Sequence, residues 1–138
     1  MTVSTDGWKH IGSTDNAEFY EVEPEILAVV PHERSVDDET TARQSIELQL
    51  EYLRRHDRRA GVIVFVDRVV DQDAGARSIY RTAPDPTRQV CFALVSEDRF
   101  GKAVASIFMK LSPPKSPTKM FEDVERAKAW IRSMVAKR

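Results

Sequence analysis

One apolar run in the middle of the chain limits the fold more than any other feature of the sequence. Residues 62–66 are Val-Ile-Val-Phe-Val, with no polar residue at any position. A strand with one face in water alternates apolar and polar residues, so a continuous β-branched run predicts a strand that is covered on both faces. Helices on both sides of a sheet provide such a cover. The run therefore predicts a central strand in an α/β fold.

Other strand patterns precede and follow this run. Residues 90–95 form a second apolar run, and residues 118–121 are short enough for an edge strand. Two more strand-like runs, residues 19–22 and 26–30, are separated by Glu23-Pro24-Glu25, a proline-containing break of the length of a hairpin connection. The predicted sheet is therefore mixed, because it opens with an antiparallel hairpin.

Helical patterns alternate with the later strands. Ser35 is placed to cap a helix in which apolar residues recur at helical spacing up to a basic run before Gly61. Asp71 and Asp73 precede a short second helix that stops at Pro84. Acidic residues at the start and basic residues at the end favour a last helix near the carboxyl terminus. The predicted helices cover residues 36–59, 74–81, 98–110 and 122–138.

The order of these elements predicts an α/β fold with a mixed, mostly parallel sheet of about five strands and about four helices. A length of 138 residues suits one domain with one core. Residues 1–15 are polar, and we expect a loose lead-in there, with Trp8 and Ile11 touching the core. Residues 16–138 are expected to form the single domain.

Charge and composition exclude several classes of function. The formal net charge is -1, so no basic field attracts nucleic acid, and no nucleic-acid partner is expected. The single cysteine, Cys91, lies in an apolar run and has no disulfide partner, which favours a reducing, cytoplasmic location. The sequence has no apolar stretch long enough to cross a bilayer, and its start lacks the pattern of a signal peptide.

The element order, together with an apolar strand that leaves through Asp67 into an Asp-rich loop and then Ala74-Gly75, resembles the STAS fold of anti-sigma-factor antagonists. The SpoIIAA-like group is the closer match. The resemblance extends over about residues 19–135. In that family a kinase phosphorylates a serine at the start of the second helix. Ala74 stands at this position and has no hydroxyl group, so the phosphoserine switch is not expected here.

The resemblance implies a non-enzymatic regulatory or protein-interaction module. Its partner would be a protein of the anti-sigma-factor or kinase type, and a homodimer is also left open. We expect the binding surface to combine the region after the central strand with the helix at residues 98–110. The residues expected in it are Asp67, Asp71, Asp73, Ala74, Gly75, Arg77, Ser78 and Arg81.

A second hypothesis is a carrier or sensor of a small apolar or lipid-like ligand. It follows from the resemblance, because some proteins grouped with this family are likened to CRAL-TRIO lipid carriers. The two hypotheses predict different interiors. A pocket of several hundred Å³ under the third helix would favour the carrier, because ligand sites are concave and mostly apolar. A solid core would favour the interaction module.

An enzyme is the weakest of the three hypotheses. Asp67, Asp71 and Asp73 follow the carboxyl end of a predicted parallel strand, where α/β sheets place their ligands, so they are the candidate catalytic carboxylates. Acidic residues before a helix are also ordinary capping residues. The three histidines have no metal-ligand spacing, and we expect neither a metal nor a cofactor.

Overall fold

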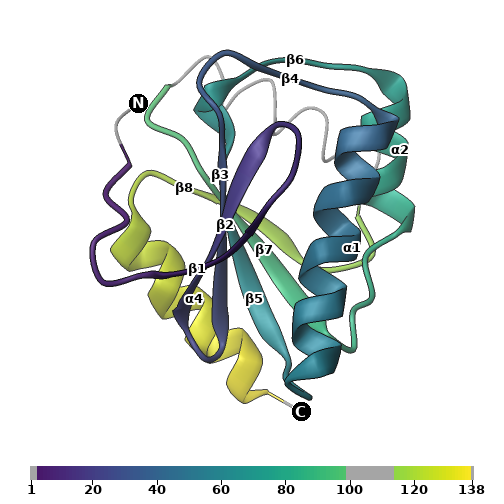
Figure 1. Cartoon of the computed structure of the whole chain (residues 1–138). Coiled ribbons are helices and arrows are strands. Elements are labelled where there is room, and N and C mark those ends of the chain that lie inside the picture. Colours follow the sequence, from purple (N-terminus) through teal and green to yellow (C-terminus); the bar gives the residue numbers. More distant parts are fainter. Residues whose placement is uncertain (1–2, 99–113, 138) are drawn as a thin grey trace.

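A six-stranded sheet forms the middle layer of the protein (Figure 1). The structure is a computed structural model, and it describes residues 3–98 and 114–137. The strand order is β1-β2-β3-β5-β7-β8. The strands are β1 (Lys9–Ser13), β2 (Ala17–Glu23), β3 (Ile26–Pro31), β5 (Ala60–Phe65), β7 (Gln89–Val95) and β8 (Thr118–Phe121).

The sheet is mixed, as the sequence predicts. The strands β1, β2 and β3 are antiparallel neighbours, and the turn at Pro24 and Glu25 joins the last two into the expected hairpin. The strands β3, β5, β7 and β8 run parallel. β5 lies between β3 and β7, so the apolar run at residues 62–66 does supply a central strand.

Helices cover both faces of the sheet (Figure 1). The helices α1 (Glu39–Arg55) and α2 (Ala74–Thr82) lie on one side, and α4 (Val124–Ala136) lies on the other. The described residues form these three α-helices, whereas the sequence predicts about four. The predicted helix at residues 98–110 lies outside the described residues, apart from its first position.

The sheet has one more strand than predicted, because part of the expected lead-in is ordered. Residues 9–13 form β1 and pair with β2 at the edge of the sheet. Trp8 lies just before this strand, and its ring is stacked on Phe65 with the centroids 6.2 Å apart. Ile11 packs against the core on the other face. Contacts with residues far along the chain therefore order a segment whose own pattern is weak.

A second difference concerns the start of α1. Ser35 does not cap the helix, because Ser35–Asp37 is extended as β4 and pairs in parallel with β6 (Val69–Gln72). We call these two strands the β4–β6 ribbon. A short 3₁₀ helix, η1 (Val66–Arg68), connects β5 to it. The true N-cap is Asp38, whose carboxylate accepts a hydrogen bond from the Thr41 amide at 2.9 Å.

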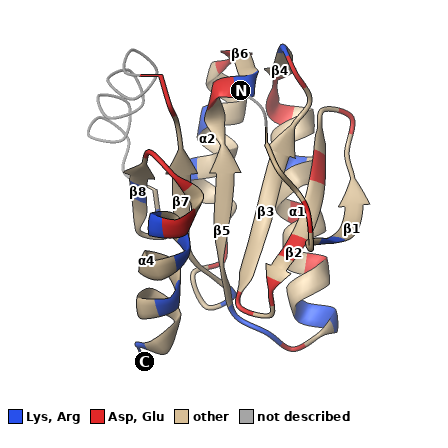
Figure 2. Ribbon diagram, turned by 90° about the vertical axis from the view of Figure 1, so that its left-hand side faces the viewer, with Lys and Arg blue, Asp and Glu red and all other residues tan. Residues whose placement is uncertain are grey.

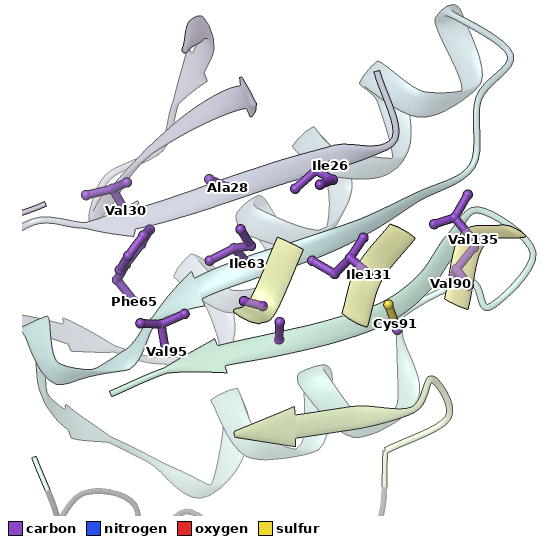
Figure 3. Close-up of a cluster of buried hydrophobic side chains, with 12 residues drawn as sticks. Ile26, Ala28, Val30, Ile63, Phe65, Val90, Cys91, Val95, Ile131 and Val135 are labelled. Carbon is purple, nitrogen blue, oxygen red and sulfur yellow. The ribbon is translucent and has the colours of Figure 1, made fainter. Parts of the chain in front are cut away.

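The core between the sheet and α4 consists of buried apolar side chains. Figure 3 shows side chains from β3, β5 and β7 pointing toward Ile131 and Val135 of α4. Ile63 and Cys91 are fully buried there. The close approach of α4 requires the glycine at position 61, because a Cβ atom on Gly61 would lie 2.4 Å from Ile131 Cγ2 and 2.9 Å from Cys91 Sγ.

Replacing Gly61 by alanine tests this packing. We expect Gly61→Ala to lower the free energy of unfolding by about 1–3 kcal/mol, because Ile131 is buried and cannot yield to the new methyl group. Urea unfolding measures the change. In a double-mutant cycle, part of the loss should disappear in the background of Ile131→Ala, which removes the atom nearest to the new methyl group. Purely additive losses would show that the two positions do not clash.

A polar cluster joins the three antiparallel strands on the surface. The Glu18 carboxylate of β2 accepts hydrogen bonds from His10 Nε2 at 2.9 Å, His32 Nε2 at 2.7 Å and Ser13 Oγ at 2.5 Å. The hydrogen bonds from His32 and then Ser13 are the main causes that lower the pKa of Glu18 to about 2. The fold thus brings together two histidines that are 22 positions apart, although their sequence spacing suggests no association.

This cluster gives the protein a specific sensitivity to acid. A carboxylate whose pKa falls on folding stabilises the fold above its unfolded pKa, here 4.5, and this contribution is lost as the pH falls toward about 2. We expect the unfolding free energy of the wild type to fall more between these two pH values than that of Glu18→Gln. Urea unfolding across this range measures both. Parallel pH profiles for the two proteins would contradict the proposed role of Glu18.

Candidate functional site

The other face of the sheet contains a cavity of about 630 Å³ between the sheet, α1 and α2. Its apolar floor is a row of three paired residues on neighbouring strands, Val29, Val64 and Leu94, with Phe92 beside them on β7. Residues of α1, α2 and β6 form the walls. The cavity therefore lies near the carboxyl ends of the parallel strands, where open α/β sheets bind their ligands.

The two faces of the sheet differ in how completely they are covered. On the α4 face, Ile63, Phe65 and Ala93 are all buried. On the cavity face, Val29 and Val62 are buried as well, whereas Val64, Phe92 and Leu94 are only half-buried. The apolar residues of α2 pack against α1, through Ala42, Ile46, Leu50, Ala76 and Ile79, and not against these strands. The described residues thus leave Val64, Phe92 and Leu94 in the middle of the sheet partly open.

The buried carboxylate of Asp37 connects the walls of the cavity. Its Oδ1 atom accepts hydrogen bonds from the Thr41 hydroxyl at 2.5 Å and from the Asn16 amide at 3.4 Å. Its Oδ2 atom accepts from the Tyr80 hydroxyl and, at 3.5 Å, from the Gln72 amide. These donors belong to α1, the segment before β2, α2 and β6. One side chain therefore links four parts of the chain.

The hydrogen bond from Tyr80 is maintained over a wide pH range. Burial, and then the charge and the hydrogen bond of Asp37, raise the pKa of the Tyr80 phenol well above its ordinary value of 10. The phenol stays protonated and continues to donate to the carboxylate. Asp37 lies at the end of β4, so this bond ties α2 to the β4–β6 ribbon.

Asp67, the first predicted site residue, lines the cavity but is already hydrogen-bonded. Its two carboxylate oxygens accept from Ser96 Oγ at 2.6 Å and from the Glu97 amide at 2.8 Å. The bonds connect the exit of β5 to the exit of β7. Asp71, on β6, also lines the cavity, and its side chain is exposed. Asp67 therefore has a structural role in this arrangement, and Asp71 is a rim residue.

Four other predicted residues lie at the start of α2 and outside the cavity lining. Asp73 is the N-cap, and its carboxylate accepts from the Ala76 amide at 2.8 Å. Ala74 and Ser78 are exposed. Gly75 lies close to the start of α1, because a Cβ atom there would be 3.1 Å from Glu39 Cβ. These residues form a surface beside the β4–β6 ribbon, and Figure 2 shows acidic residues in red around this end of the molecule.

The last two predicted residues, Arg77 and Arg81, both line the cavity. The Arg77 guanidinium donates to the Gln72 carbonyl at 2.6 Å, which fixes it against β6. Arg81 is exposed. The structure thus collects four of the eight predicted residues around the cavity, Asp67, Asp71, Arg77 and Arg81, and places the other four on the adjoining surface.

The predicted site lacks one polar wall of the cavity. Asp37 at the end of β4, and Thr41, Ser45 and Gln49 on α1, follow one another at intervals of four, and all four side chains are buried. We call them the polar stripe. Ser45 and Gln49 line the cavity, with Asp37 above them. The signal is present in the sequence, because residues four apart share one helix face and this face is next to the apolar one.

Within residues 3–98 and 114–137, no group of three or more histidine, cysteine, aspartate or glutamate side chains is arranged to hold a metal ion. The predicted carboxylates do not converge, since Asp67 has its partners just after β7 and Asp73 has its partner in α2. The described residues form a cavity with an apolar floor and hydrogen-bonding groups in its walls.

The layers and strand order place the chain in the class of SpoIIAA-like α/β folds. It is similar to the crystal structure of an uncharacterised protein of the DUF3478 family with a SpoIIAA-like fold from Shewanella loihica PV-4. The TM-score is 0.57 at 11% sequence identity, and the match covers 94% of this chain and 99% of that chain. This likeness confirms the SpoIIAA-like fold that the sequence pattern predicts.

The particular family follows from the sequence. Residues 20–135 match the DUF7793 family, described as a domain of unknown function, and the chain belongs to this family. No curated protein matches the sequence. Among the described residues, no helix has both the length and the apolar character needed to span a membrane.

The role of Asp37 can be tested by one isosteric substitution. We expect Asp37→Asn to lower the free energy of unfolding by about 2 kcal/mol or more, because an amide nitrogen would face donors where an oxygen now accepts from them. Asp71→Asn is the matched control on the paired strand of the ribbon, and its effect should stay within about 0.5 kcal/mol because Asp71 is exposed. Both unfolding free energies are measured by chemical denaturation. Equal losses in the two variants would show that the hydrogen bonds of Asp37 contribute no more to stability than an exposed aspartate does.

Proposed function

We propose that this protein is a non-enzymatic binding protein that holds a small apolar molecule in the cavity between the sheet, α1 and α2, as a carrier or a sensor. The observation that carries the proposal is that Val64, Phe92 and Leu94 in the centre of the sheet are only half-buried, whereas Ile63, Phe65 and Ala93 on the α4 face are buried. Leaving apolar surface open to water costs about 25 cal/mol per Å², and an apolar ligand on this floor would recover that energy.

The size of the cavity supports the same proposal. A volume of about 630 Å³ falls within the range of roughly 300–1,000 Å³ that is usual for small-molecule sites. Its lining combines an apolar floor with polar and charged side chains in the walls, which could fix the orientation of a ligand. Of the two hypotheses from the sequence, the carrier or sensor therefore has the stronger support. The SpoIIAA-like fold alone is compatible with both.

The hydrogen bonds of the acidic residues support a non-enzymatic role. A catalytic carboxylate must reach a substrate atom directly or through a water molecule. Both oxygens of Asp67 already accept from Ser96 and Glu97, just after β7, and Asp73 caps α2. These bonds give the two carboxylates a structural explanation that requires no substrate.

A second candidate function is the protein-interaction module that the SpoIIAA-like resemblance implies. It is favoured by Val36 and Val70 of the β4–β6 ribbon, which are 56% and 60% exposed. A hydrogen bond of 3.1 Å from the Asp73 amide to the Asp37 carbonyl joins this ribbon to the start of α2, where the exposed Ala74 lies. A partner of the anti-sigma-factor or kinase type would bind these apolar residues together with the first turn of α2.

Native mass spectrometry of the purified full chain, followed by solvent extraction, tests the main proposal. We expect a bound apolar molecule in stoichiometric amount. Leu94→Trp should remove it, because the indole would occupy the cavity floor. Met120→Trp is the matched control, because Met120 is the neighbour of Leu94 in the same row of the sheet and lies outside the cavity lining.

The same preparations separate the two candidate functions. If the protein carries no small molecule, and Val36→Glu or Ala74→Arg abolishes the capture of an anti-sigma-factor-like protein, the interaction module is correct and the carrier is wrong. If Leu94→Trp retains the molecule as well as Met120→Trp does, binding takes place elsewhere. Circular dichroism confirms that each variant is folded before it is compared.

A further inference from the structure

The polar stripe, which begins at Asp37 of β4 and continues along α1, gives the cavity a chemical preference. Asp37, Thr41, Ser45 and Gln49 are only 3%, 9%, 5% and 2% exposed. Buried polar groups are costly unless hydrogen bonds satisfy them, so each donor and acceptor in the stripe should have a partner. Among the described residues, hydrogen bonds within the protein satisfy some of these donors and acceptors and leave others without a partner.

The upper half of the stripe is satisfied within the protein. The Asp37 carboxylate has about four acceptor positions, and four donors occupy them. Thr41 donates its hydroxyl proton to Asp37, and its oxygen accepts from the Asp38 amide at 2.9 Å. Nothing in this half remains for a ligand.

The lower half of the stripe has unused donors. Gln49 Nε2 donates one proton to Ser45 Oγ at 3.1 Å, and Gln49 Oε1 accepts from Gln89 Nε2 at 2.7 Å. A glutamine amide has two protons and a serine hydroxyl has one. Within the described part of the chain, no hydrogen bond uses the second amide proton of Gln49 or the hydroxyl proton of Ser45. Both side chains line the cavity.

The apolar floor lies in the same cavity as these two donors. Val29, Val64 and Leu94 provide apolar contact on the sheet, while Ser45 and Gln49 offer protons from α1. A hydrocarbon would leave the two donors unsatisfied, and a purely polar molecule would leave the floor uncovered. The lining as a whole fits an apolar molecule that bears an oxygen acceptor.

The charges of the lining decide which acceptor fits. Among the described lining residues, there are four carboxylates and two guanidinium groups, those of Asp37, Asp67, Asp71, Asp98, Arg77 and Arg81. This excess of negative charge in the described part of the lining disfavours an anionic headgroup. An alkylammonium group would suit the charge, but it has only donors and cannot accept a proton from Ser45 or Gln49. An uncharged oxygen satisfies both conditions.

We infer that the cavity selects an uncharged amphiphile of the ester, amide or alcohol class, whose oxygen accepts hydrogen bonds from Ser45 and Gln49 while its alkyl part covers Val64, Phe92 and Leu94. The inference rests on the proposed function and specifies the ligand of that same site. Ser45 and Gln49 would then recognise the polar group of the ligand, and the sheet would recognise its alkyl chain.

Three amphiphiles with the same alkyl length test the inference: methyl decanoate, decanoate and decylammonium. Each is titrated, below its critical micelle concentration, into the solvent-extracted full chain loaded with the uncharged dye Nile red, and dye displacement gives the dissociation constants. We expect methyl decanoate to bind roughly tenfold or more tightly than either charged analogue. Ser45→Ala should weaken the binding of methyl decanoate by roughly threefold to tenfold, the effect of one hydrogen bond. The affinity for decylammonium should stay unchanged.

Ser35→Ala is the control variant, because Ser35 is another buried serine and lies on β4 outside the cavity lining. It should alter none of the three affinities. If decanoate binds as tightly as methyl decanoate, the inference is wrong, although the protein still binds a small molecule in the cavity. The same holds if Ser45→Ala changes the affinity for the neutral ligand no more than the affinities for the charged ones. If the dye and all three amphiphiles fail to bind the wild type, the proposed function itself is wrong.

Discussion

The Asp37 carboxylate shows how a single buried charge can organise several elements. Removing a carboxylate from water is costly, and the cost is recovered only when hydrogen bonds surround it. Here the four donors come from α1, α2, β6 and the segment before β2, so the charge is satisfied only when all four elements are in place. The positions of α1 and α2, and with them the walls of the cavity, therefore depend on this one side chain.

The two faces of the sheet differ in how their side chains are packed. On the α4 face, the absence of a side chain at Gly61 lets the helix approach closely, and the residues beneath it are buried. On the other face, α1 packs on the sheet through Tyr52 and Leu53, α2 packs on α1, and Val64, Phe92 and Leu94 remain half-buried. This second face therefore combines a buried apolar cluster with the cavity.

Local pattern predicts most of the fold but only part of the site. The long apolar runs and the helical spacing of Ala42, Ile46 and Leu50 identify the central strands and α1, because burial imposes those periodicities. The strands β1 and β4 are missed, because they are short, have mixed polarity and are held by pairing with distant segments. The position after β5 indicates Asp67 and Asp71, whereas the role of Asp37 depends on Asn16, Gln72 and Tyr80, three distant donors that no local pattern reveals.

The contrast between the two faces also bears on how such a chain can diverge. Substitutions on the α4 face encounter tightly packed neighbours, so few residues other than the present ones fit there. The cavity floor contributes less packing, and exchanges among Val64, Phe92 and Leu94 would alter the shape of the cavity more than the integrity of the layers. In such a fold, substitutions in the cavity floor can change which ligand fits, while the packing on the opposite face of the sheet preserves the fold.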